Sequence, residues 1–262
     1  MGALYNSENP GILRWMHYFK PMFRQRALPF CLLLALAPGA LAVGKDWPQW
    51  RGPNRDGIST ETGLLKEWRS DGPPLAWRTT GLGRGMCSVD IANGTADIPT
   101  PLVKGDYVFG SSGYGDGGSA LIKLSKAGDG VKAEEVYCLS ANQLQNHHGG
   151  MILLGDLIYM GHGHNNGFPT CVEFLTGKVV WGKERGPGSG SAAIVYADGH
   201  LYFRYQDATM ALIEATTKGY KLKSSFQLAS KLGESWPHPV ILDGKLYVRD
   251  QDVLLCYDVR AR

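Results

Sequence analysis

The stretch VYADGHLYFRYQD, from Val195 to Asp207, returns 45 residues later as VILDGKLYVRDQD, from Val240 to Asp252. Each copy has an apolar run, an Asp-Gly pair and a second run that contains aromatic residues. Asp-Gly pairs supply the positive φ angles that a tight two-residue turn needs. Tyr, Phe, Val and Ile favour a pleated, half-buried surface. Each copy therefore predicts a β-hairpin.

Two earlier stretches follow the same pattern, PLVKGDYVF from Pro101 and MILLGDLIYM from Met151. The four turn glycines are spaced 50, 44 and 45 residues apart, at Gly105, Gly155, Gly199 and Gly244. Further strand-like sequence follows each hairpin, which makes about four strands per unit, the size of a propeller blade. No stretch after residue 42 keeps a helical period. The pattern predicts an all-β propeller, with a β-sandwich of accidental periodicity as the alternative.

The segment CVEFLTGKVVW, Cys171 to Trp181, resembles the tryptophan-docking motif of pyrroloquinoline quinone (PQQ)-type propeller repeats. Cys171, Glu173, Thr176, Gly177 and Trp181 fill the motif positions. The resemblance implies that Thr-Gly turns between the third and fourth strands and that the Trp packs on a neighbouring blade. DWPQWRGPNRDGIS and the stretch from NGTADIPTP onward also look like secreted bacterial PQQ-like propeller proteins, often named polyvinyl-alcohol-dehydrogenase-like. The resemblance covers nearly all of residues 46–262.

The number of blades is the point where the chain departs from this family. The resemblance implies seven or eight blades, whereas the repeats here account for about four. GMCSVDIANG and ADIPTPLVKG both look like first strands with too little sequence between them, so we expect an internal deletion near residues 87–95. The strand-like GPPLAWR, Gly72 to Arg78, is expected to complete the last blade from the N-terminal side, because an unpaired blade edge is otherwise exposed.

The first 42 residues read as an export signal. Lys20, Arg24 and Arg26 precede an apolar run at 27–36, and small residues precede a cut after Ala42. The run is too short to span a bilayer, and an uncleaved anchor is the alternative. We therefore expect a periplasmic or secreted protein with no transmembrane segment after cleavage. The remaining domains are an N-terminal extension at 43–97 and the repeats at 98–262.

Cleavage also removes the apparent basicity of the chain. Its formal net charge of +3 comes from 27 basic and 24 acidic residues. Residues 1–42 contain four of the basic residues and one of the acidic residues, so 23 of each kind remain after cleavage. We therefore expect no nucleic-acid partner. Of the four cysteines that remain, Cys171 and Cys256 lie in alternating apolar stretches and are expected to be buried thiols.

Four of the seven histidines lie in QNHHGGMILLGDLIYMGHGHNNG, the stretch from Gln145 to Gly167. Because the first two strands of a blade are antiparallel, the start of one and the end of the next share a face. We expect His147, His148, His162 and His164 to meet there, with Asn165 and Asn166. Three interpretations remain: a transition-metal site built on the four imidazoles, a small-molecule or glycan pocket, or side chains that satisfy turn backbone groups.

Other blades carry polar residues at equivalent positions. These candidate ligand-binding residues are Arg204, Gln206, Asp207, Trp236, His238, Arg249, Gln251 and Asp252. The repeated Arg-x-Gln-Asp either pairs between adjacent blades or presents similar donors to an anionic ligand near the axis.

The family resemblance leaves the reaction open. It implies PQQ on the propeller axis between a Trp and a disulfide of adjacent cysteines, with Ca²⁺ and an Asp base, but this chain has no adjacent cysteine pair. The propeller of the outer-membrane β-barrel assembly scaffold is similar in repeat type and implies no catalysis. We expect an exported binding or scaffolding module for a small molecule, glycan or protein. The alternatives are a quinoprotein alcohol dehydrogenase-like oxidoreductase with PQQ and a metal-binding propeller.

Overall fold

The structure is a computed structural model, which describes residue 47 and residues 49–80, 90–92, 95–114, 117–182 and 184–261. The predicted export signal lies outside these ranges, as does most of the segment expected to contain a deletion. Nothing among the described residues forms a helix that is long and apolar enough to cross a bilayer.

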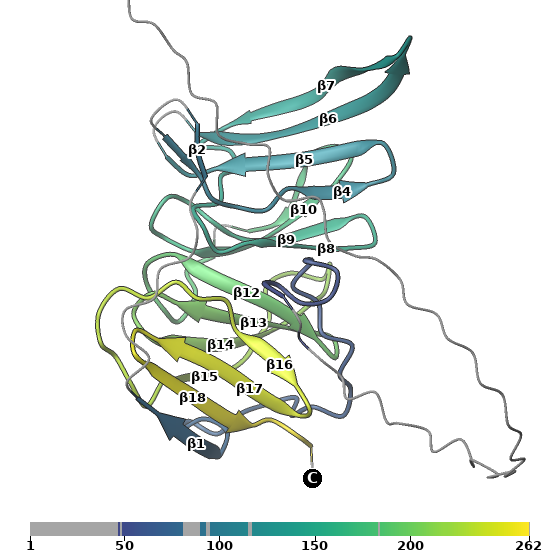
Figure 1. The fold of residues 1–262 in the computed structure, drawn as a ribbon. Helices are drawn as coiled ribbons and strands as arrows, with labels where there is room; N and C mark the ends of the chain where they lie inside the picture. The colour runs from purple at the N-terminus through teal and green to yellow at the C-terminus, as the bar shows by residue number, and fades with distance from the viewer. Residues whose placement is uncertain are drawn as a thin grey trace, which may run out of the picture. The chain divides into compact units, whose positions relative to one another are not determined.

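The described chain is all-β, and its strands form four four-stranded antiparallel sheets that follow one another in chain order (Figure 1). The first sheet contains β4 (Leu102–Lys104), β5 (Tyr107–Ser112), β6 (Gly118–Ala127) and β7 (Gly130–Ser140). The second contains β8 (Met151–Leu154), β9 (Leu157–His162), β10 (Phe168–Glu173) and β11 (Val179–Trp181). The third contains β12 (Ala192–Ala197), β13 (His200–Tyr205), β14 (Thr209–Glu214) and β15 (Leu222–Gln227).

The last sheet combines both ends of the described chain. It contains β16 (Val240–Leu242), β17 (Lys245–Asp250), β18 (Val253–Asp258) and, at its outer edge, β1 (Leu75–Thr79). β1 pairs antiparallel with β18, with Trp77 opposite Cys256. The expected completion of the last blade by an N-terminal strand is therefore confirmed, and with it the prediction of a β-propeller built from four-stranded blades. β2 (Asp90–Ala92) and β3 (Thr95–Asp97) form a separate two-stranded antiparallel sheet.

The four turn glycines adopt the conformation that the repeat predicts. Gly105, Gly155, Gly199 and Gly244 have φ angles of 56°, 60°, 80° and 65°. In the last two hairpins the preceding Asp198 and Asp243 also have positive φ, at 47° and 53°. Both central residues of these turns are therefore left-handed, which matches the twist of the strands that they join.

Apolar side chains hold each sheet against the next. Along β13 every residue is buried, and alternate residues face opposite neighbours. Leu201 and Phe203 belong to the core shared with the second sheet, whereas Tyr202 belongs to the core shared with the last sheet. A third core, which includes Phe109 and Met160, joins the first and second sheets. Alternation with period 2 gives a strand two usable faces, so an inner sheet is covered on both sides.

The tryptophan motif has the role that the resemblance implies. Gly177, at φ 69°, donates its N–H to the Glu173 carbonyl in the turn between β10 and β11. The Trp181 indole Nε1 donates to the Thr216 carbonyl oxygen at 2.7 Å, beside the third sheet, and its ring contacts Tyr220 there. This side chain therefore fastens the second sheet to the third.

The segment before β1 packs on three sheets and was not placed by the sequence pattern. Ile58 forms a parallel bridge with Tyr196 of β12, and the Ser59 hydroxyl donates to the Ile241 carbonyl in β16. Farther on, Trp68 lies between Tyr202 and Phe226. Residues 57–68 thus contact both the third sheet, at β12, β13 and β15, and the last sheet, at β16.

The cysteine predictions are confirmed where the structure describes them. Cys171 and Cys256 are buried free thiols, as expected from their alternating apolar surroundings. Cys138, on β7, is an exposed free thiol. Cys87 lies outside the described residues.

Candidate functional site

Three of the four predicted imidazoles meet at the ends of β8 and β9. The His147 ring centroid lies 4.2 Å from that of His148 and 4.2 Å from that of His164. The Tyr114 ring, from the first sheet, completes this imidazole cluster at 4.5 Å from His147 and 5.2 Å from His164. The antiparallel pairing of β8 with β9 produces this meeting, as the sequence predicted.

His162 ends β9 but has a different role from the cluster. Its Nδ1 accepts the backbone N–H of Gln145 at 3.1 Å, which ties the entry of β8 to the exit of β9. This contact corresponds to the third interpretation of the histidines, in which they satisfy turn backbone groups.

Two glycines allow the cluster to form. A Cβ on Gly149 would lie 1.4 Å from the Ala192 carbonyl oxygen, and one on Gly113 would lie 2.5 Å from the Cα of His147. Any side chain at these positions would push β8 away from the third sheet or the first sheet away from His147. The glycines therefore bring three sheets together around the imidazoles.

Hydrogen bonds orient two members of the cluster. His147 Nδ1 and the Ser191 hydroxyl are 2.5 Å apart, and that hydroxyl also donates to the His164 carbonyl at 3.1 Å. His164 Nδ1 is hydrogen-bonded to the Gly113 carbonyl oxygen, so its N–H must be on Nδ1. Ser191 was not among the predicted residues. Its position just before β12 was the available signal, because that place in the blade is equivalent to His147 and His148.

Burial favours the neutral form of three imidazoles, those of His147, His148 and His238. Desolvation, with a smaller contribution from neighbouring His164, lowers the pKa of His147 to about 4. The pKa of His148 falls to about 3, chiefly by desolvation and then by neighbouring His147. Burial, followed by the charge of Arg51, lowers the pKa of His238 to about 3. A neutral imidazole has one donor and one acceptor nitrogen, so His147, His148 and His238 carry hydrogen-bonding capacity without charge.

Part of this capacity is unused within the described protein. Nε2 of His147 and both ring nitrogens of His148 are buried without a hydrogen-bond partner there. Such groups are costly in a native structure unless a water or a ligand satisfies them. In the described ranges no three His, Cys, Asp or Glu side chains are placed to hold a metal ion. Metal binding by His147, His148, His162 and His164 therefore stays a prediction.

A second layer of aromatic and basic side chains adjoins His148. The Trp236 ring lies 5.0 Å from it, and His238 Nε2 donates to the His148 carbonyl oxygen at 3.4 Å. Trp50 meets His238 edge to face at 5.4 Å, and the Arg51 guanidinium donates to the Met151 carbonyl oxygen. Trp50 and Arg51 were noted in the sequence only as part of the family-like stretch, without a role.

The repeated arginines have different surroundings. Arg204 is fully buried and pairs with Asp250 of the adjacent sheet at 3.3 Å, while Asp250 also accepts bonds from the Ser230 hydroxyl and the Leu232 N–H. Arg249 donates instead to the Gln251 carbonyl oxygen. Pairing between adjacent blades is thus observed for Arg204, with Asp250 as the acid in place of the repeated Asp207 or Asp252.

A polar pocket of about 460 Å³ lies beside the cluster, where loops of the second, third and last sheets meet. Its lining residues are Asn165, Ser189, Gly190, Gln206, Asp207, Lys231, Gly233 and Glu234. Two contacts connect it to the cluster: Asn165 Oδ1 accepts the N–H of Ser191, and Gln206 Oε1 accepts the indole N–H of Trp236. The predicted Asn165, Gln206 and Asp207 therefore share one pocket.

The other predicted residues lie around this pocket or apart from it. Asn166 is exposed, and its side chain lies over Gly163. The Gln251 amide donates to the Glu234 carbonyl oxygen, at the edge of the pocket. Asp252 is half-buried in the turn between β17 and β18.

The residues present do not fit the PQQ clamp that the resemblance implies. The chain contains no two adjacent cysteines. The described thiols are free and lie on three different sheets, at Cys138, Cys171 and Cys256. No step of a mechanism is therefore assigned to PQQ.

Comparisons with known proteins add the following findings. No protein-family model and no curated protein sequence matches the chain. The crystal structure of BamB from Moraxella catarrhalis is similar at 14% identity and a TM-score of 0.45, over 63% of this chain and 44% of that chain. This chain thus spans less than half the length of that BamB.

A chain from an S. cerevisiae assembly of Dbp5 with Nup159, Gle1, IP6 and ADP is similar at 8% identity and a TM-score of 0.30, over 78% of this chain and 74% of that one. With sequence identities and TM-scores this low, neither similarity indicates what this chain does.

Proposed function

We propose that this protein is an exported β-propeller that binds a small, uncharged, hydroxyl-rich ligand of the saccharide class, without catalysis. The observation that carries the proposal is the polar pocket lined by loops of three successive sheets. A volume of about 460 Å³ is within the range of small-molecule sites.

The chemistry of the pocket favours a neutral polyol over an ion. Asp207 and Glu234 outnumber Lys231 among the charged lining residues, so the pocket offers no surplus positive charge to an anion. The side-chain amides of Asn165 and Gln206 each combine donors with an acceptor. The nearby imidazoles of His147 and His148 have lowered pKa values and are neutral. A hydroxyl group is likewise both donor and acceptor, so it can pair with either kind of group.

Saturation-transfer NMR with glucose, galactose, N-acetylglucosamine and cellobiose tests this proposal. We expect saturable binding of at least one of these sugars. The Asn165→Ala/Gln206→Ala variant should bind at least tenfold more weakly, because two hydrogen bonds of about 1 kcal/mol each are removed. Lys132→Ala, on the distant β6–β7 hairpin, is the matched control and should bind as the wild type does.

Two results would contradict the proposal. Absence of saturable binding to all four sugars, or equal affinity in the double variant, would remove the saccharide pocket. Reduction of a dye by an alcohol after PQQ and Ca²⁺ are added would show an enzyme instead.

A further inference from the structure

The two end sheets of the described structure each have one covered face and one open face. In the inner strands β9 and β13, residues that face either side are buried. In β17 burial alternates strictly, with Leu246, Val248 and Asp250 buried and the residues between them half-exposed. In β5 only Phe109 is fully buried. The described strands of the first and last sheets do not pack on each other.

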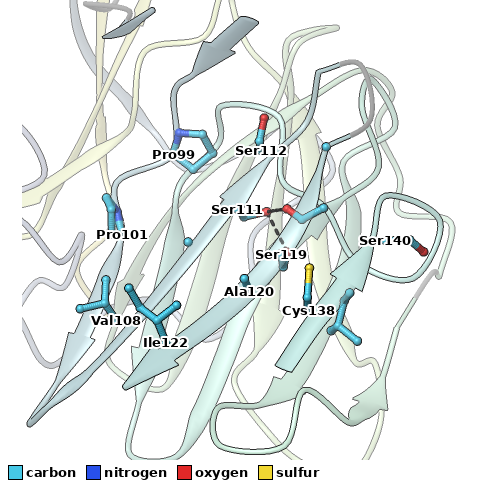
Figure 2. Close-up of a pocket in the computed structure, with 14 residues that line it drawn as sticks. Pro99, Pro101, Val108, Ser111, Ser112, Ser119, Ala120, Ile122, Cys138 and Ser140 are labelled. Atoms are coloured by element: carbon cyan, nitrogen blue, oxygen red, sulfur yellow. Dashed lines mark hydrogen bonds between the residues drawn. The ribbon is translucent and has the colours of Figure 1, made fainter. Parts of the chain in front are cut away.

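The open face of the first sheet is hollowed and combines aliphatic side chains with glycines and serines. Val108 and Ile122 are paired across β5 and β6, so their side chains share this face, and Cys138 extends it onto β7 (Figure 2). A pocket of about 580 Å³ lies over them, bordered by Pro99 and Pro101. Val103, on the adjacent β4, is 65% exposed. A neighbouring blade covers such a face in the inner sheets of this molecule.

The open face of the last sheet combines apolar side chains with charged ones, since Lys245, Tyr247 and Arg249 alternate on the half-exposed side of β17. Trp77, Cys256, Tyr247 and Val240 are partners in one row across β1, β18, β17 and β16, so their side chains lie on one side of the sheet. Trp77 is 44% exposed and contacts Tyr247 at 6.0 Å between ring centroids. This face therefore offers Trp77 and Tyr247 as an aromatic patch beside the Lys245–Asp258 ion pair.

We propose that the chain forms a twofold-symmetric dimer in which the open face of the first sheet packs on the open face of the last sheet of a second copy. The twofold axis generates this contact twice, so both open faces of both copies are covered and the assembly closes. The partner is a second copy of this chain because the chain itself presents both halves of a blade-to-blade contact. The inference is independent of the proposed ligand.

The area available is adequate for a stable dimer. The last sheet is the smaller face, with strands of 3, 5, 6 and 6 residues. At about 3.3 Å per residue and about 4.8 Å between strands, this face covers about 300 Å². Two contacts with two faces each then bury about 1,200 Å² in total, which lies at the lower end of the range of specific protein interfaces.

Light scattering coupled to gel filtration of a chain that starts at Trp47 tests the proposal. We expect twice the chain mass for the wild type. Leu254 lies two residues before Cys256 on β18, so its side chain is on the same open face as Trp77. Val103→Lys/Ile122→Lys alters only the first face, Trp77→Glu/Leu254→Glu alters only the last face, and each variant alone should run at the mass of one chain. Leu232→Lys, on an exposed loop away from both faces, is the control and should remain dimeric.

Mixing the two variants separates loss of the interface from loss of folding. In the mixed pair one contact is wild type and the other joins Lys to Glu, so the mixture should return to twice the chain mass. Alkylation of Cys138, followed by mass spectrometry, should be at least tenfold slower in the wild-type dimer than in the first-face variant. A wild type with the mass of one chain, a last-face variant that stays dimeric, or a mixture that does not reassemble would overturn the proposal.

Discussion

His147, His148 and His238 are residues whose burial sets their charge. Their pKa values in the folded protein, about 4, 3 and 3, lie well below the value near 6.5 of an unfolded chain. Below pH 6.5 the unfolded chain therefore binds protons that the folded protein excludes. The free energy of unfolding is at its full value above pH 6.5 and falls as the pH drops towards the folded pKa values.

We predict a loss of about 2 kcal/mol in the free energy of unfolding for each of these imidazoles between pH 7 and pH 5. Urea unfolding at the two pH values measures it. The His147→Gln/His148→Gln variant should lose markedly less on acidification, because two of the three groups no longer titrate. His200→Gln, outside the cluster, should keep the wild-type loss. If the double variant and the wild type lose the same amount, the buried imidazoles are not responsible.

At the same scale, the sequence predicted which residue types would gather but not which atoms would pair. The antiparallel order of two strands was enough to bring His147 and His148 near His164. Two contacts depend instead on side-chain rotamers and on the spacing of the packed sheets. One is the hydrogen bond of His162 with a backbone amide, and the other is the ion pair of Arg204 with Asp250. Because Arg204 and Asp250 lie 46 residues apart in sequence, no local pattern specifies their contact.

At the scale of the element, Trp181 contributes more than any other residue of its short strand to the contact between the second and third sheets. Its side chain is 8% exposed, it contacts Tyr159 and Tyr220, and it donates to the Thr216 carbonyl. Strand β11 is only three residues long, so the strand itself provides little other anchoring.

We predict that Trp181→Ala lowers the free energy of unfolding by about 3–5 kcal/mol, because it leaves a cavity and an unpaired carbonyl between two sheets. Trp181→Phe should cost less, because most of the apolar contact remains. Val179→Ala, at an exposed position of the same strand, should change stability by no more than about 0.5 kcal/mol. Urea titration of the three variants makes the comparison, and a loss below about 1 kcal/mol for Trp181→Ala would contradict the docking role.

At the scale of the whole molecule, residues 47–79 hold distant sheets together. The segment bonds to β12 through Ile58, inserts Trp68 against Tyr202, and ends as the outer strand beside β18. The sequence predicted the final strand of this segment, because the last repeat lacked a fourth strand and Gly72–Arg78 was an isolated strand-like stretch. It did not predict the contacts of residues before this strand, since they follow no repeat pattern.

We predict that a chain starting at Gly81 loses its cooperative thermal transition and aggregates, whereas a chain starting at Trp47 melts as the full chain does. The shorter chain exposes the β18 edge and uncovers the apolar core beneath Trp68. Circular dichroism melting and gel filtration of the two chains give the comparison. A cooperative, monodisperse chain that starts at Gly81 would show that this segment is dispensable.

The sequence by itself determined the architecture, because its decisive signals are local. A glycine at positive φ, strands of period 2 and a repeat of about 45 residues specify hairpins that form one blade after another. Only the tertiary structure decided the site. The pocket, the neutral state of the imidazoles, the Arg204–Asp250 pair and the contact of Arg51 with Met151, 100 residues away, all arise from how the sheets pack. Burial and contact between distant segments are properties of the packed molecule, so no stretch of sequence contains them.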